Sequence, residues 1–153
     1  IVDMPPGTGD IQLTLSQSSP LTGAVVVTTP QDIARIDAKK GLKMFEKVNV
    51  PLLGIVENMS VFICPCCGEV THIFGEGGAK RMSEQYGVPM LGELPLSPAI
   101  REAADSGRPT VAAEPESAAA KMYRAIAMKI AGSIAKLGKD YTARMPTISV
   151  KND

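Results

Sequence analysis

The sequence predicts an α/β fold: a doubly wound, mostly parallel sheet with helices on both faces. Two apolar runs, 23–29 (GAVVVTT) and 51–57 (PLLGIVE), lack the alternation of a strand with one face in water. Between them, residues 31–47 carry apolar side chains at helical spacing. A strand, a helix and a second buried strand in this order indicate parallel strands joined by a crossover helix. Ligands in such folds bind at the carboxyl ends of the strands, where we expect a site.

The sequence is expected to begin inside a β-strand. Residues 1–3 (IVD) are interpreted as the end of a buried strand, and because the first residue is Ile1 rather than Met we expect the chain to be the C-terminal part of a longer protein. Residues 4–10 hold two prolines and two glycines, which predicts a shaped loop. Residues 11–17 predict a short helix with Thr8 or Asp10 as its cap. The face expected to be buried in helix 31–47 consists of Ile33, Ile36 and Met44, flanked by Leu42 and Phe45.

The C-terminal part of the sequence continues the alternation of strands and helices. A loop follows residue 58, and then come a helix over 76–86 ended by Gly87, a strand over 90–93, and a helix from Ser97 ended near Gly107. The longest helix is expected over 116–137, with a stripe of Met122, Ile126, Ile130, Ile134 and Leu137. We therefore expect one domain over 1–137, with a metal loop at 64–67, and a polar tail over 138–153.

Composition and charge argue against several classes of protein function. The 153 residues are 44% hydrophobic and 21% charged, which is typical of a globular domain. Sixteen basic residues balance sixteen acidic ones, which argues against a broad nucleic-acid surface. No apolar run approaches the roughly 20 residues of a membrane span. We therefore expect neither nucleic acid nor a membrane as a partner. All three cysteines lie in one loop rather than in a disulfide framework, so we expect the protein in the reducing cytoplasm.

The three cysteines form the motif Cys64-Pro65-Cys66-Cys67-Gly68. The C-x-x-C spacing of Cys64 and Cys67 turns two thiolates toward one point, and soft thiolates suit zinc, cuprous copper or an iron–sulfur cluster. This is half of a four-ligand site: the rest comes either from His72 and a carboxylate or from a second copy of the chain. Cys66 adjoins Cys67 and is expected to point away. A structural zinc knuckle and a redox dithiol stay open as alternatives, although a redox pair normally opens a helix.

Polar residues near strand ends suggest a nucleotide site. Asp3 follows apolar residues and begins D-x-P-P-G-T-G-D, which favours a Walker B-type carboxylate serving Mg²⁺ over a simple capping acid. Gly7 would let a backbone N–H approach a γ-phosphate. Asn58 has the donor and acceptor to read a purine edge, but a turn Asn bonding its own backbone is the commoner case. The chain contains no G-x-x-x-x-G-K-[ST] loop to hold phosphates.

Several motifs in order resemble the Mrp/ApbC family, MinD-like P-loop ATPases that carry iron–sulfur clusters. They are DMPPGTGD (3–10), VTTPQD (27–32), GIVENMS (54–60), CPCCG (64–68), IFGEGG (73–78), LGELPLSPAI (91–100) and GRP (107–109). The resemblance covers residues 1 to about 137. The family's Walker A loop and opening strands are absent from this chain, so ATP hydrolysis is expected of the full-length protein.

The resemblance implies a homodimer that holds one [4Fe–4S] cluster, with Cys64 and Cys67 contributed by each subunit. It places Asp3 and Gly7 at the Mg²⁺ and γ-phosphate of ATP, and Asn58 at the adenine. The implied partners are cluster scaffold proteins and the apo-proteins that receive the cluster.

Two further interpretations remain beside this one. In the first, Cys64 and Cys67 bind zinc and only organise a dimer of a MinD- or ParA-like ATPase. In the second, the protein is a positioning ATPase on a membrane or nucleoid, which would require a basic amphipathic helix. The segment 141–153 contains Pro146 and shows no such face.

Overall fold

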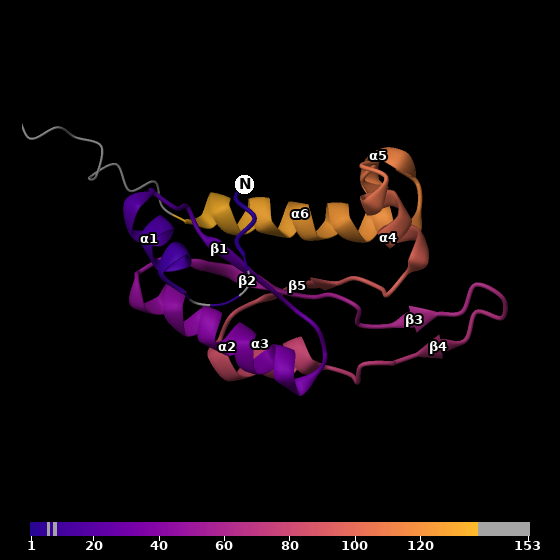
Figure 1. Ribbon diagram of the computed structural model, residues 1–153, viewed down its shortest axis with the longest axis horizontal. Helices are drawn as coiled ribbons and strands as arrows, with labels where there is room; N and C mark the ends of the chain where they lie inside the picture. The colour runs from indigo at the N-terminus through magenta and orange to yellow at the C-terminus, as the bar shows by residue number, and fades with distance from the viewer. Residues whose placement is uncertain (6, 8, 138–153) are drawn as a thin grey trace, which may run out of the picture.

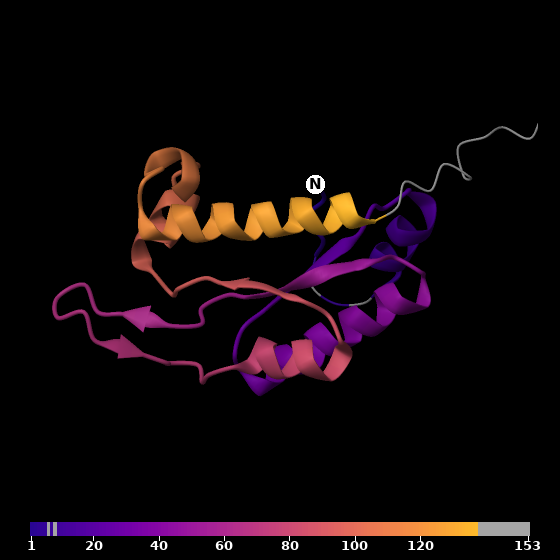
Figure 2. The same ribbon diagram turned by 180° about the vertical axis from the view of Figure 1, so that it is seen from behind.

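The computed structural model describes residues 1–5, 7 and 9–137, and it has a three-stranded parallel sheet at its centre. The strand order is β1 (Ala24–Thr28), β2 (Leu52–Glu57) and β5 (Met90–Glu93). Helices α2 (Asp32–Lys47) and α3 (Gly78–Tyr86) cover one face, and α6 (Ala118–Lys136) covers the other (Figures 1 and 2). The predicted fold class, a parallel sheet between helical layers, is confirmed.

Two apolar clusters lie on opposite faces of this sheet. Consecutive residues of the central strand β2 serve different clusters, because successive side chains of a strand point to opposite faces: Ile55 packs in the first and Val56 in the second. The first cluster contains Val26, Ala38, Leu42, Ile55, Ala79, Met82 and Val88. The second contains Val56, Leu91, Leu94 and Ile126. Coverage of both faces is incomplete at the edge strand β1, where Val27 remains 61% exposed.

The remaining helices are α1 (Asp10–Ser18), α4 (Pro98–Asp105) and α5 (Thr110–Ala113). Gly87 ends α3 in the left-handed conformation, with φ of 63°, as the sequence predicts. Ser117 precedes α6, and its hydroxyl oxygen accepts a hydrogen bond of 3.1 Å from the backbone N–H of Ala120. Helix α5 was not predicted, because four residues are too few for a periodic pattern.

The prediction for the first residues is wrong. Residues 1–3 form no strand, and Ile1 and Val2 are exposed. A strand exists only through hydrogen bonds to a neighbour, and no strand in the described part of the chain pairs with this segment. The predicted caps of α1 also fail where the structure describes them: Gly9 is the N-cap, and Asp10 is already the first helical residue. Thr8 lies outside the described residues.

The buried faces of two helices differ from the expectation. In α2 the buried side chains are Ala38, Leu42 and Met44, whereas Ile33 and Ile36 are 75% and 55% exposed. Ile36 precedes Ala38 by two residues, or about 200° around the helix, so the two side chains point in opposite directions. The small Ala38 lets the helix approach the sheet closely, and the larger isoleucines stay outside. In α6, Ile126 and Ile130 of the predicted apolar stripe pack in the second cluster, while Met122 and Ile134 are partly exposed.

The expected cysteine loop has secondary structure of its own. Strands β3 (Phe62–Ile63) and β4 (Val70–Thr71) pair antiparallel and form a hairpin that projects from the body of the molecule (Figures 1 and 2). We call residues 58–77 the cysteine arm. Its strands have two residues each, below the length at which alternation of side chains can be recognised in a sequence.

Candidate metal centre on the cysteine arm

The base of the cysteine arm is fixed to the end of β5. The backbone N–H and the hydroxyl of Ser60 both donate to the carbonyl oxygen of Leu94, at 3.0 and 3.2 Å. Just after the returning strand β4, Nδ1 of His72 lies 3.1 Å from the carbonyl oxygen of Ser60. Ser60 is buried, so these bonds are shielded from water. The arm is therefore held to the segment after β5 through Ser60, and Val61 adds a hydrogen bond of 2.8 Å from the backbone N–H of Leu96.

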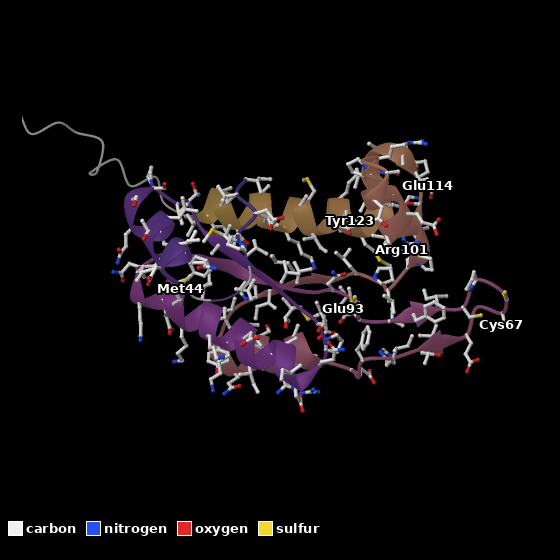
Figure 3. The ribbon with its side chains drawn as sticks, viewed as in Figure 1. Met44, Cys67, Glu93, Arg101, Glu114 and Tyr123 are labelled. Atoms are coloured by element: carbon white, nitrogen blue, oxygen red, sulfur yellow. The ribbon has the colours of Figure 1, made fainter. Side chains whose placement is uncertain are left out.

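The tip of the arm is a tight turn that carries all three cysteines. The backbone N–H of Cys64 donates to Glu69 at 2.9 Å, and that of Gly68 donates to Cys64 at 2.8 Å. Gly68 has a φ of 74°, a conformation that glycine adopts without a Cβ penalty. Figure 3 shows Cys67 at the far end of the arm. Local hydrogen bonds thus bring Cys64 and Cys67 to one turn, as the C-x-x-C spacing predicts.

The turn also favours the thiolate form of Cys64. Backbone N–H groups of Cys67 and Cys66 donate to the Cys64 sulfur, and these hydrogen bonds lower the pKa of this thiol. The thiolate is the form that binds metals and attacks electrophiles. Cys64 is half-buried, whereas Cys66 and Cys67 are exposed and all three thiols are free. The arm therefore presents an open pair of sulfur ligands, one of them stabilised as an anion.

The two ligands are not completed from nearby residues. Among the described residues no group of three or more His, Cys, Asp or Glu side chains is placed to share a metal ion. His72 contacts Ser60 at the base of the arm rather than the cysteines at its tip. Completion by His72 and a carboxylate therefore finds no support in the described residues.

Glu57 is a residue that sequence reasoning missed. It ends β2, it is 1% exposed, and its Oε2 accepts a hydrogen bond of 2.5 Å from the backbone N–H of Ala79 in the first turn of α3. A carboxylate at a helix N-terminus is stabilised by unpaired N–H groups and the helix dipole. Because the arm leaves the sheet after Glu57 and returns just before α3, this bond joins both of its ends. The available signal was an acid that ends the apolar run PLLGIVE.

Asn58 lies at the carboxyl end of β2, as predicted. Its backbone N–H donates to Thr28 of the neighbouring strand at 2.7 Å, and its Oδ1 accepts from the backbone N–H of Met59 at 2.9 Å. Met59 has a φ of 54°, so Asn58 stabilises a left-handed turn at the start of the arm. The side-chain amide nitrogen makes no hydrogen bond within the described part of the chain, and it is open to a ligand.

The other candidate nucleotide residues lie in the segment before α1. Asp3 is exposed and forms no hydrogen bond or ion pair with the described residues. Gly7 has a φ of 104°, and a Cβ placed there would meet no atom within 4 Å. Within residues 1–5, 7 and 9–137, no hydrogen bond or ion pair joins Asp3 or Gly7 to Asn58. The structure therefore brings the cysteines into one turn, whereas no direct bond in the described part of the chain joins the candidate nucleotide residues to one another.

Comparison with known proteins identifies the family. Residues 1–131 match the model of the ParA family, described as NUBPL iron-transfer P-loop NTPase. The chain belongs to this family. A protein of Escherichia coli K12 named iron-sulfur cluster carrier protein is 60% identical over 134 residues, which are 88% of this chain and 36% of that protein. The mouse iron-sulfur cluster transfer protein NUBPL is 55% identical over 130 residues, 85% of this chain and 41% of that protein. The chain thus spans less than half the length of these relatives.

Solved structures agree with this assignment. The nucleotide-binding protein of Archaeoglobus fulgidus in complex with ADP superimposes with a TM-score of 0.63 at 40% identity, over 74% of this chain and 46% of that one. The cell division ATPase MinD of Pyrococcus furiosus gives a TM-score of 0.57 at 30% identity, over 72% of this chain and 43% of that one. The MinD-like P-loop fold and the family resemblance are therefore confirmed. None of the helices in the described residues is long and apolar enough to span a bilayer.

Proposed function

We propose that this chain belongs to an ATP-dependent iron–sulfur cluster carrier, which holds a [4Fe–4S] cluster between two copies and passes it to apo-proteins. The observation that carries the proposal is the tip of the cysteine arm. There Cys64 and Cys67 form an accessible C-x-x-C pair, and backbone N–H groups hold the Cys64 sulfur toward its anionic form. The names of the relatives point to the same cargo.

The number of ligands favours a shared site. A [4Fe–4S] cluster takes four thiolates, and one arm offers two, so two arms related by a two-fold axis supply the full set. Exposure of Cys67 at the end of a projecting hairpin lets a second arm reach it. The same exposure leaves the cargo accessible to an acceptor protein, which a carrier needs and a permanent cofactor site avoids.

The nucleotide residues fit ATP and Mg²⁺ by their chemistry. Asp3 offers an exposed carboxylate that has no hydrogen-bond or ion-pair partner among the described residues, and hard cations prefer such oxygen ligands. Gly7 leaves its backbone open on the side that a Cβ would occupy, and Asn58 keeps an amide nitrogen free to donate to a base. When bound, Mg²⁺ neutralises the phosphate charge. We propose that residues 1–137 act as part of a cytoplasmic P-loop domain that needs a Walker A loop, which this chain does not contain. The predicted polar tail over 138–153 lies outside the described residues.

One structural link supports coupling between nucleotide and cluster. Asn58 is both the proposed adenine contact and the first residue of the cysteine arm, and its backbone is bonded to Thr28 of β1. The next residue, Met59, is held in a left-handed turn by the Asn58 side chain. A ligand that reorients this amide would therefore change the turn from which the arm begins.

Anaerobic reconstitution with iron and sulfide tests the proposal. We expect a brown dimer with about four irons and four sulfides per two chains, since that is what four thiolates hold. Tightly held zinc in a colourless protein would favour the second candidate, a structural dimerisation module, because the same turn suits zinc. The same reconstitution is carried out on a form of the protein that carries a Walker A loop. If that form takes up neither iron nor sulfide, the carrier function is overturned.

A further inference from the structure

A groove lies directly beside the cysteines and has no role in the function proposed so far. It has a volume of about 520 Å³ and lies between the cysteine arm and the helical corner formed by α4, α5 and the start of α6. Ile63 and Pro65 of the arm form one side, residues 95–98 form the floor, and the rest of α4, α5 and the first turn of α6 form the opposite wall. We call this space the arm groove. Figure 3 shows Arg101 and Glu114 on the helical corner, at the same end of the molecule as Cys67.

We propose that the arm groove docks an apolar segment with a basic side chain from the protein that receives the cluster; this rests on the carrier function proposed above. The first argument is position. Pro65 lies between Cys64 and Cys66 in the sequence and also lines the groove, so a segment seated there lies next to the metal ligands. The volume falls within the roughly 300–1,000 Å³ of ligand sites, which suits a few side chains rather than a whole domain.

The second argument is shape. The wall opposite the arm is rich in small side chains, including Ala99, Ala103 and Ala113, which leave room for larger side chains to enter. The floor is rigid, because Pro95 and Pro98 have fixed φ and the backbone N–H of Leu96 donates to Val61 of the arm at 2.8 Å. A preformed apolar wall lowers the entropy that an incoming peptide must lose on binding.

The third argument is charge. The only charged side chains that line the groove are Glu102 and Glu114, both acidic, within the described residues. Glu102 pairs with Arg101 at 3.2 Å, whereas Glu114 forms no ion pair with any described residue. No lysine or arginine occurs between residues 48 and 79, a stretch that includes the whole arm and three glutamates. The helix dipole at the N-terminus of α6 offsets these negative charges by only about half a positive charge. The charge around the groove therefore stays negative and favours a basic occupant.

Cluster transfer measured on loaded protein tests this docking site. The variants are Ala99→Trp, which fills the groove from an exposed position, and Glu114→Lys, which reverses its unpaired charge. The matched controls are Ala125→Trp on α6 and Glu84→Lys on α3, both exposed and neither part of the groove lining. Each loaded protein is mixed with apo-aconitase, whose returning activity reports the cluster, and separately with a small iron chelator, which needs no docking.

We expect Ala99→Trp to slow transfer to apo-aconitase about tenfold, equivalent to 1.4 kcal/mol. Glu114→Lys should slow it about threefold and flatten its dependence on salt, as loss of a steering charge does. Iron content, dimer size and the rate of iron loss to the chelator should match the wild type, and both controls should transfer normally.

Three results would overturn the inference. Normal transfer by both groove variants would remove the groove from recipient docking while leaving the carrier function in place. A groove variant that becomes monomeric and loses its iron would show that a second copy of the chain, not the recipient, occupies the groove. A wild-type chain that binds iron but passes none to apo-aconitase, although the chelator removes it, would contradict both docking and carriage.

Discussion

The cysteine arm and the segment before α1 carry the two candidate sites, and they are built in opposite ways. The arm's tip is formed by hydrogen bonds between residues at most five positions apart, such as Cys64 to Glu69. The segment before α1 has an exposed carboxylate at Asp3, an open backbone at Gly7 and exposed apolar side chains at Ile1 and Val2. The cysteine turn holds its two thiols in place by local hydrogen bonds, whereas the segment before α1 exposes its candidate groups without a described bond between them.

The difference shows which kind of site a short stretch of chain can form. A metal turn needs only ligands at a fixed spacing and backbone N–H groups that support them, all of which residues 64–69 provide. A nucleotide site in a parallel sheet needs the carboxyl ends of several strands at one edge. Of the three candidate nucleotide residues, only Asn58 follows directly on a strand of the described sheet, and Asp3 and Gly7 lie in a segment that forms no strand.

The largest expected effect concerns the arm. Cys67→Ser removes one of the two proposed ligands per chain and should lower the affinity for iron by more than the roughly 10–100-fold that loss of an outer-shell partner costs. Thermal unfolding should change little, because the Cys67 side chain is exposed. Iron and sulfide assays after reconstitution measure the effect. Cys66→Ser is the matched control, and a Cys67→Ser protein with wild-type iron would contradict the assignment.

The next effect concerns the segment before α1. In a form of the protein that carries a Walker A loop, Asp3→Asn should lower ATP turnover about tenfold or more, since it weakens a carboxylate proposed to hold Mg²⁺ through water. Phosphate release at saturating ATP measures it. Iron loading should persist, because the arm forms independently. Wild-type turnover in this variant would remove Asp3 from the magnesium site.

A smaller effect is expected where the arm joins the sheet. Glu57→Ala should lower the free energy of unfolding by about 1–3 kcal/mol, because it leaves the buried N–H of Ala79 without a partner. Urea denaturation of the apo-protein measures it. Glu93→Ala is the matched control: Glu93 pairs with Glu57 in the strand register, but it is exposed and should change stability by about 0.5 kcal/mol or less. Equal losses in both variants would show that the Glu57–Ala79 bond does not stabilise the fold.

The smallest effect concerns the turn itself. Backbone N–H groups of Cys67 and Cys66 lower the pKa of Cys64, so its thiolate is favoured in the folded protein. The stabilisation is present above the pKa of the unfolded thiol and is lost as pH falls through the lower pKa of the folded state. Alkylation of the apo-protein, followed by mass spectrometry at each cysteine, should reach half its maximal rate at lower pH for Cys64 than for the same residue in urea. Coincident midpoints would remove this role of the turn.

Most of the central architecture could be predicted from the sequence. Apolar runs bounded by glycine, proline or polar residues predict the strands at 24–28, 52–57 and 90–93. Gly87 predicts the end of α3, and Ser97-Pro98 predicts the start of α4. These features are predictable because each depends on side chains within a few residues. The C-x-x-C turn belongs to the same class. The short strands β3 and β4 were missed because two residues carry no periodic signal.

What the sequence alone determined is therefore the alternation of elements, the sulfur pair and the family resemblance. The tertiary structure decided which helix faces are buried, since Ala38 rather than Ile36 meets the sheet. It also decided that Glu57 closes the base of the arm and that Pro65 faces a groove shared with α4 and α5. These contacts join residues from 22 to some 50 positions apart, and no local pattern encodes them: they arise only when strands and helices pack against one another.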